Sequence, residues 1–227
     1  MGEFIWRICA KIVFNIGITI VVHIREHILM AKNFLVTDFE FTVYTKPVGK
    51  PRGFFSEILE IGATKLAGDT FERIGDIQSF VKPQFYPKQA EESLNFSMIT
   101  MADLKKGILF PEMIERMKQH YIPSETYFVA WGDADFKVID TACKRYKIEN
   151  PVMFTDYLDL AAGYKLLFEK EKTPSLKSAA EEQNVVMEGT WHTALDDAIN
   201  TSKLLVKLLE GGWDVEAFMA TQEKTAY

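Results

Sequence analysis

Residues 34–44 of the chain read Phe34-Leu35-Val36-Thr37-Asp38-Phe39-Glu40-Phe41-Thr42-Val43-Tyr44. The stretch is rich in β-branched and aromatic residues, which predicts a strand. Two carboxylates interrupt it at positions i and i+2, and side chains two apart on a strand share one face. We therefore expect Asp38 and Glu40 to lie side by side. The alternative is an edge strand whose polar face meets water.

Two carboxylates this close on a buried strand repel each other and are costly to desolvate. A hard divalent cation between them removes that cost, because Mg²⁺ and Mn²⁺ prefer carboxylate oxygen. A divalent-metal site is therefore the first functional hypothesis, to be weighed against the other charged residues of the chain.

The composition limits the class of protein. The chain has 227 residues, 48% hydrophobic and 13% aromatic, so it can bury a sizeable core, and no linker composition divides it. A net charge of −6 argues against a protein that coats nucleic acid indiscriminately, although an empty metal site supplies several of those charges. Cys9 and Cys143 are too few for a disulfide framework or a zinc site. We expect a cytoplasmic protein.

Residues 1–29 form an N-terminal extension, and its uncharged run 12–24 is shorter than the about 20 apolar residues of a spanning helix. An apolar anchor is one interpretation. We favour another, in which the native protein starts at Met30 and the extension is translated upstream sequence. Arg25-Glu26 can be encoded AGG-GAG, which contains the ribosome-binding core GGAG three codons before Met30. The functional domain is then expected at residues 30–227.

The order of elements after Lys32 predicts an α/β fold. Three strands, near residues 34–44, 56–66 and 71–81, have short connections that predict an antiparallel meander. The later elements are expected to be helices 91–106 and 112–121, strand 126–131, helix 136–146, strand 153–155, helices 158–169 and 176–183, and a final helix 194–209. This order predicts a mixed central sheet, antiparallel over its first three strands and flanked by helices.

Two further aspartates lie where strand 126–131 ends and the next helix begins. One aspartate at such a junction is a favoured helix N-cap, but two are harder to explain by capping alone. We predict that Asp133 is the cap and that Asp135 is a metal ligand, and the reverse assignment stays open.

The final helix is preceded by a histidine, in the sequence His192-Thr193-Ala194-Leu195-Asp196-Asp197. Thr193 and Asp196 resemble a capping box, which would begin the helix there and leave Asp197 free. Residues five apart on a helix lie about 140° apart, so His192 and Asp197 share a site only if His192 lies in the preceding loop. A lone histidine is usually structural, but beside these carboxylates His192 is a candidate general base.

Together these motifs resemble the DEDDh 3′-5′ exonucleases in order and in rough spacing. Within that superfamily the chain is similar to the Eri-type branch, on the segments Asp38-Phe39-Glu40-Phe41-Thr42, Glu57-Ile58-Leu59-Glu60-Ile61-Gly62 and Trp131-Gly132-Asp133-Ala134-Asp135. The resemblance covers nearly everything after Met30 and nothing before it.

The resemblance implies a ribonuclease-H-like fold and hydrolysis of single-stranded RNA or DNA from the 3′ end to nucleoside 5′-monophosphates. It implies two Mg²⁺ or Mn²⁺ ions, with His192 as the general base. The metal carboxylates that it implies are Asp38, Glu40, Asp135 and Asp197. It also implies backbone contacts of Phe41 and Thr42 with the terminal nucleotide. This chain departs from the family at Ala134, where a bulky residue is usual.

Other functions are also compatible with these residues. A ribonuclease-H-type endonuclease would share the metal carboxylates, although His-x-x-x-x-Asp favours the exonuclease. The Eri-type branch includes a bacterial inhibitor of sporulation, so the chain is also a candidate regulator of sporulation. The alternative function is a regulatory protein-binding module whose nuclease activity is secondary. We expect nucleic-acid 3′ ends as partners and no obligatory membrane.

Overall fold

The computed structural model describes residues 32–46 and 48–224 of the chain. The expectations for residues 1–29 and for a start at Met30 lie outside the described residues. No helix in the described ranges combines the length and the apolar character that crossing a bilayer requires.

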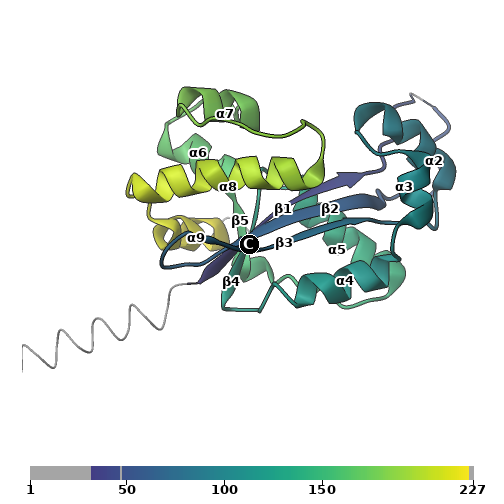
Figure 1. The fold of residues 1–227 in the computed structure, drawn as a ribbon, viewed down its shortest axis with the longest axis horizontal. Helices are drawn as coiled ribbons and strands as arrows, with labels where there is room; N and C mark the ends of the chain where they lie inside the picture. Colours follow the sequence, from purple (N-terminus) through teal and green to yellow (C-terminus); the bar gives the residue numbers. More distant parts are fainter. Residues whose placement is uncertain (1–31, 47, 225–227) are drawn as a thin grey trace, which may run out of the picture.

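A mixed five-stranded sheet forms the centre of the molecule (Figure 1). Strand β1 (Asn33–Phe41) pairs antiparallel with β2 (Ile58–Leu66), which pairs antiparallel with β3 (Arg73–Phe80). On its other side β1 pairs parallel with β4 (Thr126–Ala130), and β4 pairs parallel with β5 (Tyr157–Asp159). The order β3-β2-β1-β4-β5 confirms the predicted mixed sheet with its antiparallel start.

Helices cover both faces of this sheet. Helix α8 (Ala194–Glu210) lies across one face, and α4 (Phe110–Lys118) and α5 (Ala134–Tyr146) pack on the other (Figure 1). The other helices of the described residues are α2 (Pro87–Ser93), α3 (Met101–Lys106), α6 (Leu160–Leu167), α7 (Leu176–Glu182) and α9 (Val215–Lys224), with 3₁₀ turns at Leu94–Phe96 and Phe154–Asp156.

Alternation along β1 divides the core into two parts. Leu35 and Phe39 belong to the cluster under α4 and α5, whereas Phe34 and Val36 belong to the cluster under α6, α8 and α9. Asp38 and Glu40 have the same parity as Phe34 and Val36, so they emerge on the face that α8 covers. The predicted pairing of the two carboxylates on one face therefore holds at the carboxyl end of β1.

Two predicted elements are wrong. The helix expected at 91–106 is interrupted, because Thr100 and Asp103 form a capping box that begins a separate helix, α3. The short strand expected at 153–155 is a turn of 3₁₀ helix, and β5 follows it at Tyr157–Asp159. Only three residues pair in that strand, so local composition carries little signal for it.

Helix α9 is absent from the sequence prediction, which ended the chain's helices at 209. Val215, Phe218 and Met219 recur at helical spacing and are buried in the cluster under α8. These three residues are the signal in the sequence for this helix.

Glu57 anchors the start of β2 to two distant segments. Its buried carboxylate accepts hydrogen bonds from the backbone N–H groups of Gln84, Phe85 and Tyr86 at 2.6–3.1 Å. It also accepts one from the hydroxyl of Tyr146, at the end of α5, at 3.0 Å. A buried carboxylate is tolerated where donors surround it in this way.

Candidate active site

Asp38 and Glu40 lie on a central strand, between β2 and β4. The edge-strand alternative is therefore wrong. In the β1–β2 ladder Asp38 lies opposite Gly62 and Glu40 lies opposite Glu60, and the register then slips between Glu40 and Phe41. Such irregularities re-aim side chains at the end of a strand.

Helix α5 brings Asp135 to this strand. The Asp135 side chain is buried, and its Oδ1 accepts a hydrogen bond from the Phe39 N–H, between the two strand carboxylates, at 2.8 Å. Asp133 precedes the helix but makes no side-chain capping bond; it is exposed and pairs with Lys137 instead. Asp135 is thus the junction aspartate that reaches the strand carboxylates. The capping bond expected of Asp133 is absent, and its backbone (φ −94°, ψ −1°) lacks the extended conformation typical of a capping residue.

His192 and Asp197 meet at the start of α8. The helix begins at Ala194, so His192 lies in the preceding loop, where the spacing argument required it. The His192 N–H donates to Asp197 Oδ2 at 3.0 Å, and the residue has a left-handed backbone with φ of +64°. Its carbonyl accepts from the N–H of Met98 at 3.3 Å, which joins this loop to the segment between α2 and α3.

The capping box predicted for Thr193 and Asp196 is wrong. Thr193 makes no side-chain capping bond, and Asp196 Oδ2 accepts from the Thr190 N–H at 2.8 Å. The turn before the helix folds back over the first turn of α8, and its Thr190 N–H donates a hydrogen bond to the Asp196 carboxylate. Asp197 is free of a capping role, as predicted, but for this different reason.

Glu60 supplies the acceptor that Thr193 does not. It is 1% exposed, its Oε2 accepts from the Ala194 N–H at 3.4 Å, and its Oε1 accepts from Gln78 Nε2 at 3.1 Å. A Cβ on Gly62 would lie 2.0 Å from the backbone of Ala194, so α8 rests directly on β2. Sequence reasoning gave Glu60 no role. The available signal was a carboxylate within the apolar run of β2.

Mutual repulsion and burial raise the pKa values of these carboxyl groups. Burial, followed by repulsion from Asp135 and Asp197, raises the pKa of Asp38 well above its usual range. Burial and the charge of Asp197 raise the pKa of Glu40 to about 8, and burial raises the pKa of Asp135 to about 7. Burial also raises the pKa values of Asp197 and Glu60. The site thus favours bound positive charge, whether protons or a cation.

Asp38, Glu40 and Asp197 line a cavity of about 230 Å³, and Asp135 and Glu60 are not part of its lining. The full lining is Asp38, Phe39, Glu40, Phe41, Val43, Leu59, Ser93, Ser97, His192 and Asp197. Glu40, His192 and Asp197 each offer one ligand atom, all within 4.8 Å of one another. Of the two residues expected to contact the nucleotide, Phe41 lines this cavity and Thr42 does not. Thr42 is fully buried, its N–H donates to the Glu57 carbonyl, and its hydroxyl oxygen accepts from the Glu57 N–H.

The donor set fits a divalent cation. Asp197 Oδ1 is buried and has no hydrogen-bond partner among the residues that the structure describes. A buried carboxylate oxygen without a donor is costly, and a cation bound by Asp197 and Glu40 would remove that cost. Oxygen-rich sites of this kind suit Mg²⁺ and Mn²⁺.

The chain is similar to known exonucleases. The exonuclease family (RNase_T) matches residues 35–205. The probable 3′-5′ exonuclease KapD of Bacillus subtilis is 33% identical over 80% of this chain and 86% of its own length. Human ERI1 exoribonuclease 2 is 30% identical over 78% of this chain. That protein is longer, and the match covers only 28% of its length.

The solved nuclease domain of 3′hExo, a DEDDh family member bound to rAMP, has the same fold. It superposes with a TM-score of 0.69 at 20% identity, over 80% of this chain and 94% of that domain. The match of the family over most of the chain, together with the KapD similarity, decides the assignment. The chain belongs to the RNase_T exonuclease family.

Proposed function

We propose that the chain removes nucleotides one at a time from the 3′ end of single-stranded RNA or DNA, releasing nucleoside 5′-monophosphates. One observation carries the proposal. Three segments far apart in sequence bring Asp38, Glu40, Asp135 and Asp197 together beside His192. The names of the relatives support the polarity and the substrate class, since KapD is named a 3′-5′ exonuclease and the 3′hExo domain bound rAMP.

Exonucleases of this family use divalent metal ions. In this chain we assign Asp38, Glu40, Asp135 and Asp197 as the residues that hold two Mg²⁺ or Mn²⁺ ions. Bound there, the ions would activate a water and stabilise the oxygen that leaves phosphorus, in an in-line displacement. The raised pKa values of Asp38 and Glu40 support the assignment, because bound cations offset the repulsion that raises them.

His192 is the proposed general base. Its imidazole is exposed, and its backbone N–H is fixed to Asp197 at the edge of the cavity. It takes the proton of the attacking water; the new bond joins that oxygen to phosphorus, and the bond from phosphorus to the 3′ oxygen of the preceding nucleotide breaks. The leaving 3′ oxygen then takes a proton from solvent. Phe41 and Val43 form an apolar wall for the terminal nucleoside.

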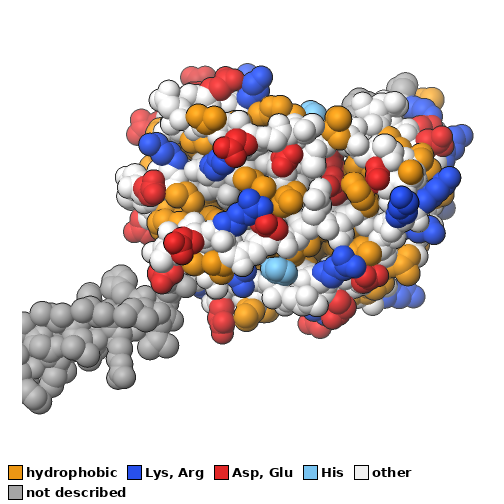
Figure 2. Space-filling view, viewed as in Figure 1, with side chains coloured by type: hydrophobic (Ala, Val, Ile, Leu, Met, Phe, Trp, Pro, Cys, Tyr) orange, Lys and Arg blue, Asp and Glu red, His pale blue; other side chains and the backbone are white. Residues whose placement is uncertain are grey.

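Lys and Arg side chains lie near the cavity. Figure 2 shows them at the end of the molecule formed by α2 and α3, interspersed with Asp and Glu. Ser93, at the end of α2, and Ser97, just beyond it, line the carboxylate cavity, so this end of the molecule borders it. A nucleic-acid strand approaching from there can contact these Lys and Arg side chains with its phosphates.

The test uses labelled single strands of RNA and DNA with Mg²⁺, Mn²⁺ or EDTA, resolved at single-nucleotide steps. We expect a ladder that shortens from the 3′ end, is absent in EDTA, and falls at least 100-fold in Asp38→Asn and His192→Asn. Asp133→Asn is the matched control, because Asp133 is exposed and two residues from Asp135. Retention of full turnover by either site variant would refute the assignment. Cleavage of a circular strand would show an endonuclease instead.

The sporulation role and the protein-binding alternative stay predictions. The His192→Asn variant separates them from the nuclease, because it removes the proposed base and keeps the fold. In a strain that lacks the native gene, restoration of normal sporulation timing by this variant would show that the nuclease activity is secondary. We expect it to fail.

A further inference from the structure

A second cavity, of about 270 Å³, lies between α5 and the connection from β1 to β2. We call it the α5 groove, and its lining is Lys50, Phe54, Phe55, Ser56, Lys137, Val138, Thr141 and Arg145. Three of these side chains are cationic, two are aromatic and none is a carboxylate. The chain as a whole carries a net charge of −6, so this lining is opposite in sign to the average of the protein.

Two of the cations are held by rings rather than by carboxylates. The Arg145 guanidinium lies 5.6 Å from the centre of the Phe55 ring, and Lys50 Nζ lies 5.2 Å from the centre of the Phe54 ring. Neither cation forms an ion pair within residues 32–46 and 48–224. A ring contact orients such a side chain and leaves its N–H donors available for an anion.

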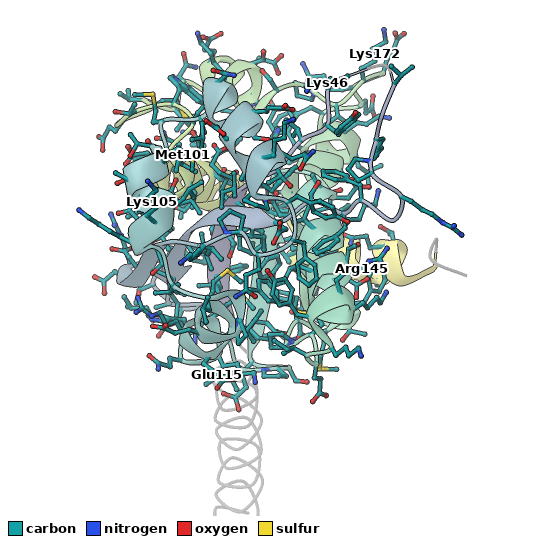
Figure 3. The ribbon with its side chains drawn as sticks, turned by 90° about the vertical axis from the view of Figure 1, so that its right-hand side faces the viewer. Lys46, Met101, Lys105, Glu115, Arg145 and Lys172 are labelled. Carbon is teal, nitrogen blue, oxygen red and sulfur yellow. The ribbon has the colours of Figure 1, made fainter. Side chains whose placement is uncertain are left out.

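The groove begins beside the candidate active site. Val138 lies three residues beyond Asp135 on the same side of α5, and Arg145 lies ten residues beyond Asp135, about 15 Å along the helix axis. On the opposite wall, Val43 lines the carboxylate cavity while the ring of the next residue, Tyr44, lies 5.8 Å from the ring of Phe54. Figure 3 views the molecule from the right-hand side of Figure 1, with Lys46 and Arg145 labelled.

We propose that the α5 groove binds the substrate strand a few nucleotides upstream of the 3′ end. The proposal rests on the exonuclease function proposed above. Proteins that bind single strands combine a cationic groove, which follows the phosphates, with aromatic rings on which bases stack. Lys50 and Arg145 supply the phosphate contacts. The half-buried ring of Phe54 supplies the accessible edge of an aromatic cluster that includes Tyr44 and Tyr86. The groove takes single-stranded nucleic acid as its ligand class.

The test measures binding of a labelled 12-nucleotide single strand in EDTA, where no hydrolysis occurs, as a function of salt. Each phosphate contact with a single strand contributes about 0.7 to the slope of log K against log salt. The double variant Lys50→Gln, Arg145→Gln removes two cations. We expect it to lower the slope of log K against log salt by about 1.4, which weakens binding about 25-fold at 0.1 M salt. Thr141→Glu, which puts a carboxylate on the groove floor, is expected to weaken binding without removing a ring contact.

Lys144→Gln is the matched control, because Lys144 neighbours Arg145 in sequence but pairs with Asp140 outside the groove. We expect it to bind as the wild type does. The ratio of kcat/KM for a 12-nucleotide strand to that for a dinucleotide is expected to fall in the double variant and to stay constant in Lys144→Gln.

Two outcomes would overturn the proposal. One is a double variant and a Thr141→Glu variant that keep wild-type affinity and salt slope. The other is that the variants lose affinity for a poly-glutamate chain by the same factor as for the single strand, which would show that the groove is a general anion site. Absence of hydrolysis with Mg²⁺ and Mn²⁺ would refute the exonuclease function. Weaker binding of the strand by the groove variants in EDTA would still support the proposal that the α5 groove binds single-stranded nucleic acid.

Discussion

The replacement Gly62→Ala tests how closely α8 must approach the sheet. A Cβ at this position would lie 2.0 Å from the Ala194 carbonyl carbon and 2.0 Å from the Leu195 nitrogen. Ordinary contacts begin at 3.4 Å, so the start of α8 must retreat by 3.4 − 2.0, or about 1.4 Å. The clash is with backbone, which cannot swing aside. We therefore expect the upper part of the usual cost of overpacking, about 3 kcal/mol, and a fall in Tm of roughly 6–12 °C.

The same shift moves His192 and Asp197 away from the carboxylates of β1. A misplacement of about 1 Å in a catalytic site costs on the order of 100-fold in rate, so we expect kcat/KM to fall by about that factor at a temperature where the variant is folded. Urea denaturation and the 3′-end ladder assay give the two values. Gly75→Ala on β3 is the control, because its Cβ would meet only the flexible His120 ring at 3.4 Å. A Gly62→Ala variant with wild-type kcat/KM would refute the close-approach argument.

Three further results are expected. In EDTA, Glu40→Gln should raise the free energy of unfolding at pH 9 by about 1–2 kcal/mol and have little effect at pH 5. The pKa of the Glu40 carboxyl is about 8 in the folded state, against an ordinary 4.5. The protonated carboxyl therefore stabilises the fold at low pH, and this contribution is lost as the pH rises through 8. Mn²⁺ at about 100 times its Kd should stabilise the wild type by about 2.7 kcal/mol, and Asp38→Asn should abolish most of that gain in a thermal melt. Glu57→Gln should cost about 2–3 kcal/mol in urea denaturation, because an amide replaces an acceptor for three backbone N–H groups.

Features that depend on neighbouring residues could be predicted from the sequence. The shared face of Asp38 and Glu40 follows from the period of a strand, and the loop position of His192 follows from helical spacing. The buried strand at 126–131 and the three-stranded start are equally local, because each is a run of apolar residues bounded by turns. The predicted mixed sheet followed from these elements and is confirmed.

Features that depend on contacts between distant segments could not be predicted. Thr193 and Asp196 have the spacing of a capping box, but the turn at Thr190 competes for Asp196, and Glu60 from β2 supplies the acceptor. The three residues of β5 pair only because β4 lies beside them. Local pattern therefore located the candidate metal carboxylates, and the tertiary fold determined what holds them in place.

The left-handed backbone at His192 limits which residues this position accepts. Only glycine adopts that conformation freely, and asparagine, aspartate and histidine are the other side chains enriched in it. Histidine codons CAU and CAC become the asparagine codons AAU and AAC through one base change. On the proposed mechanism, a single point mutation thus converts the enzyme into a stably folded protein that still grips a strand end and no longer cuts it. One base change in the codon for His192 is therefore enough to give a form of this protein that binds nucleic acid without cleaving it.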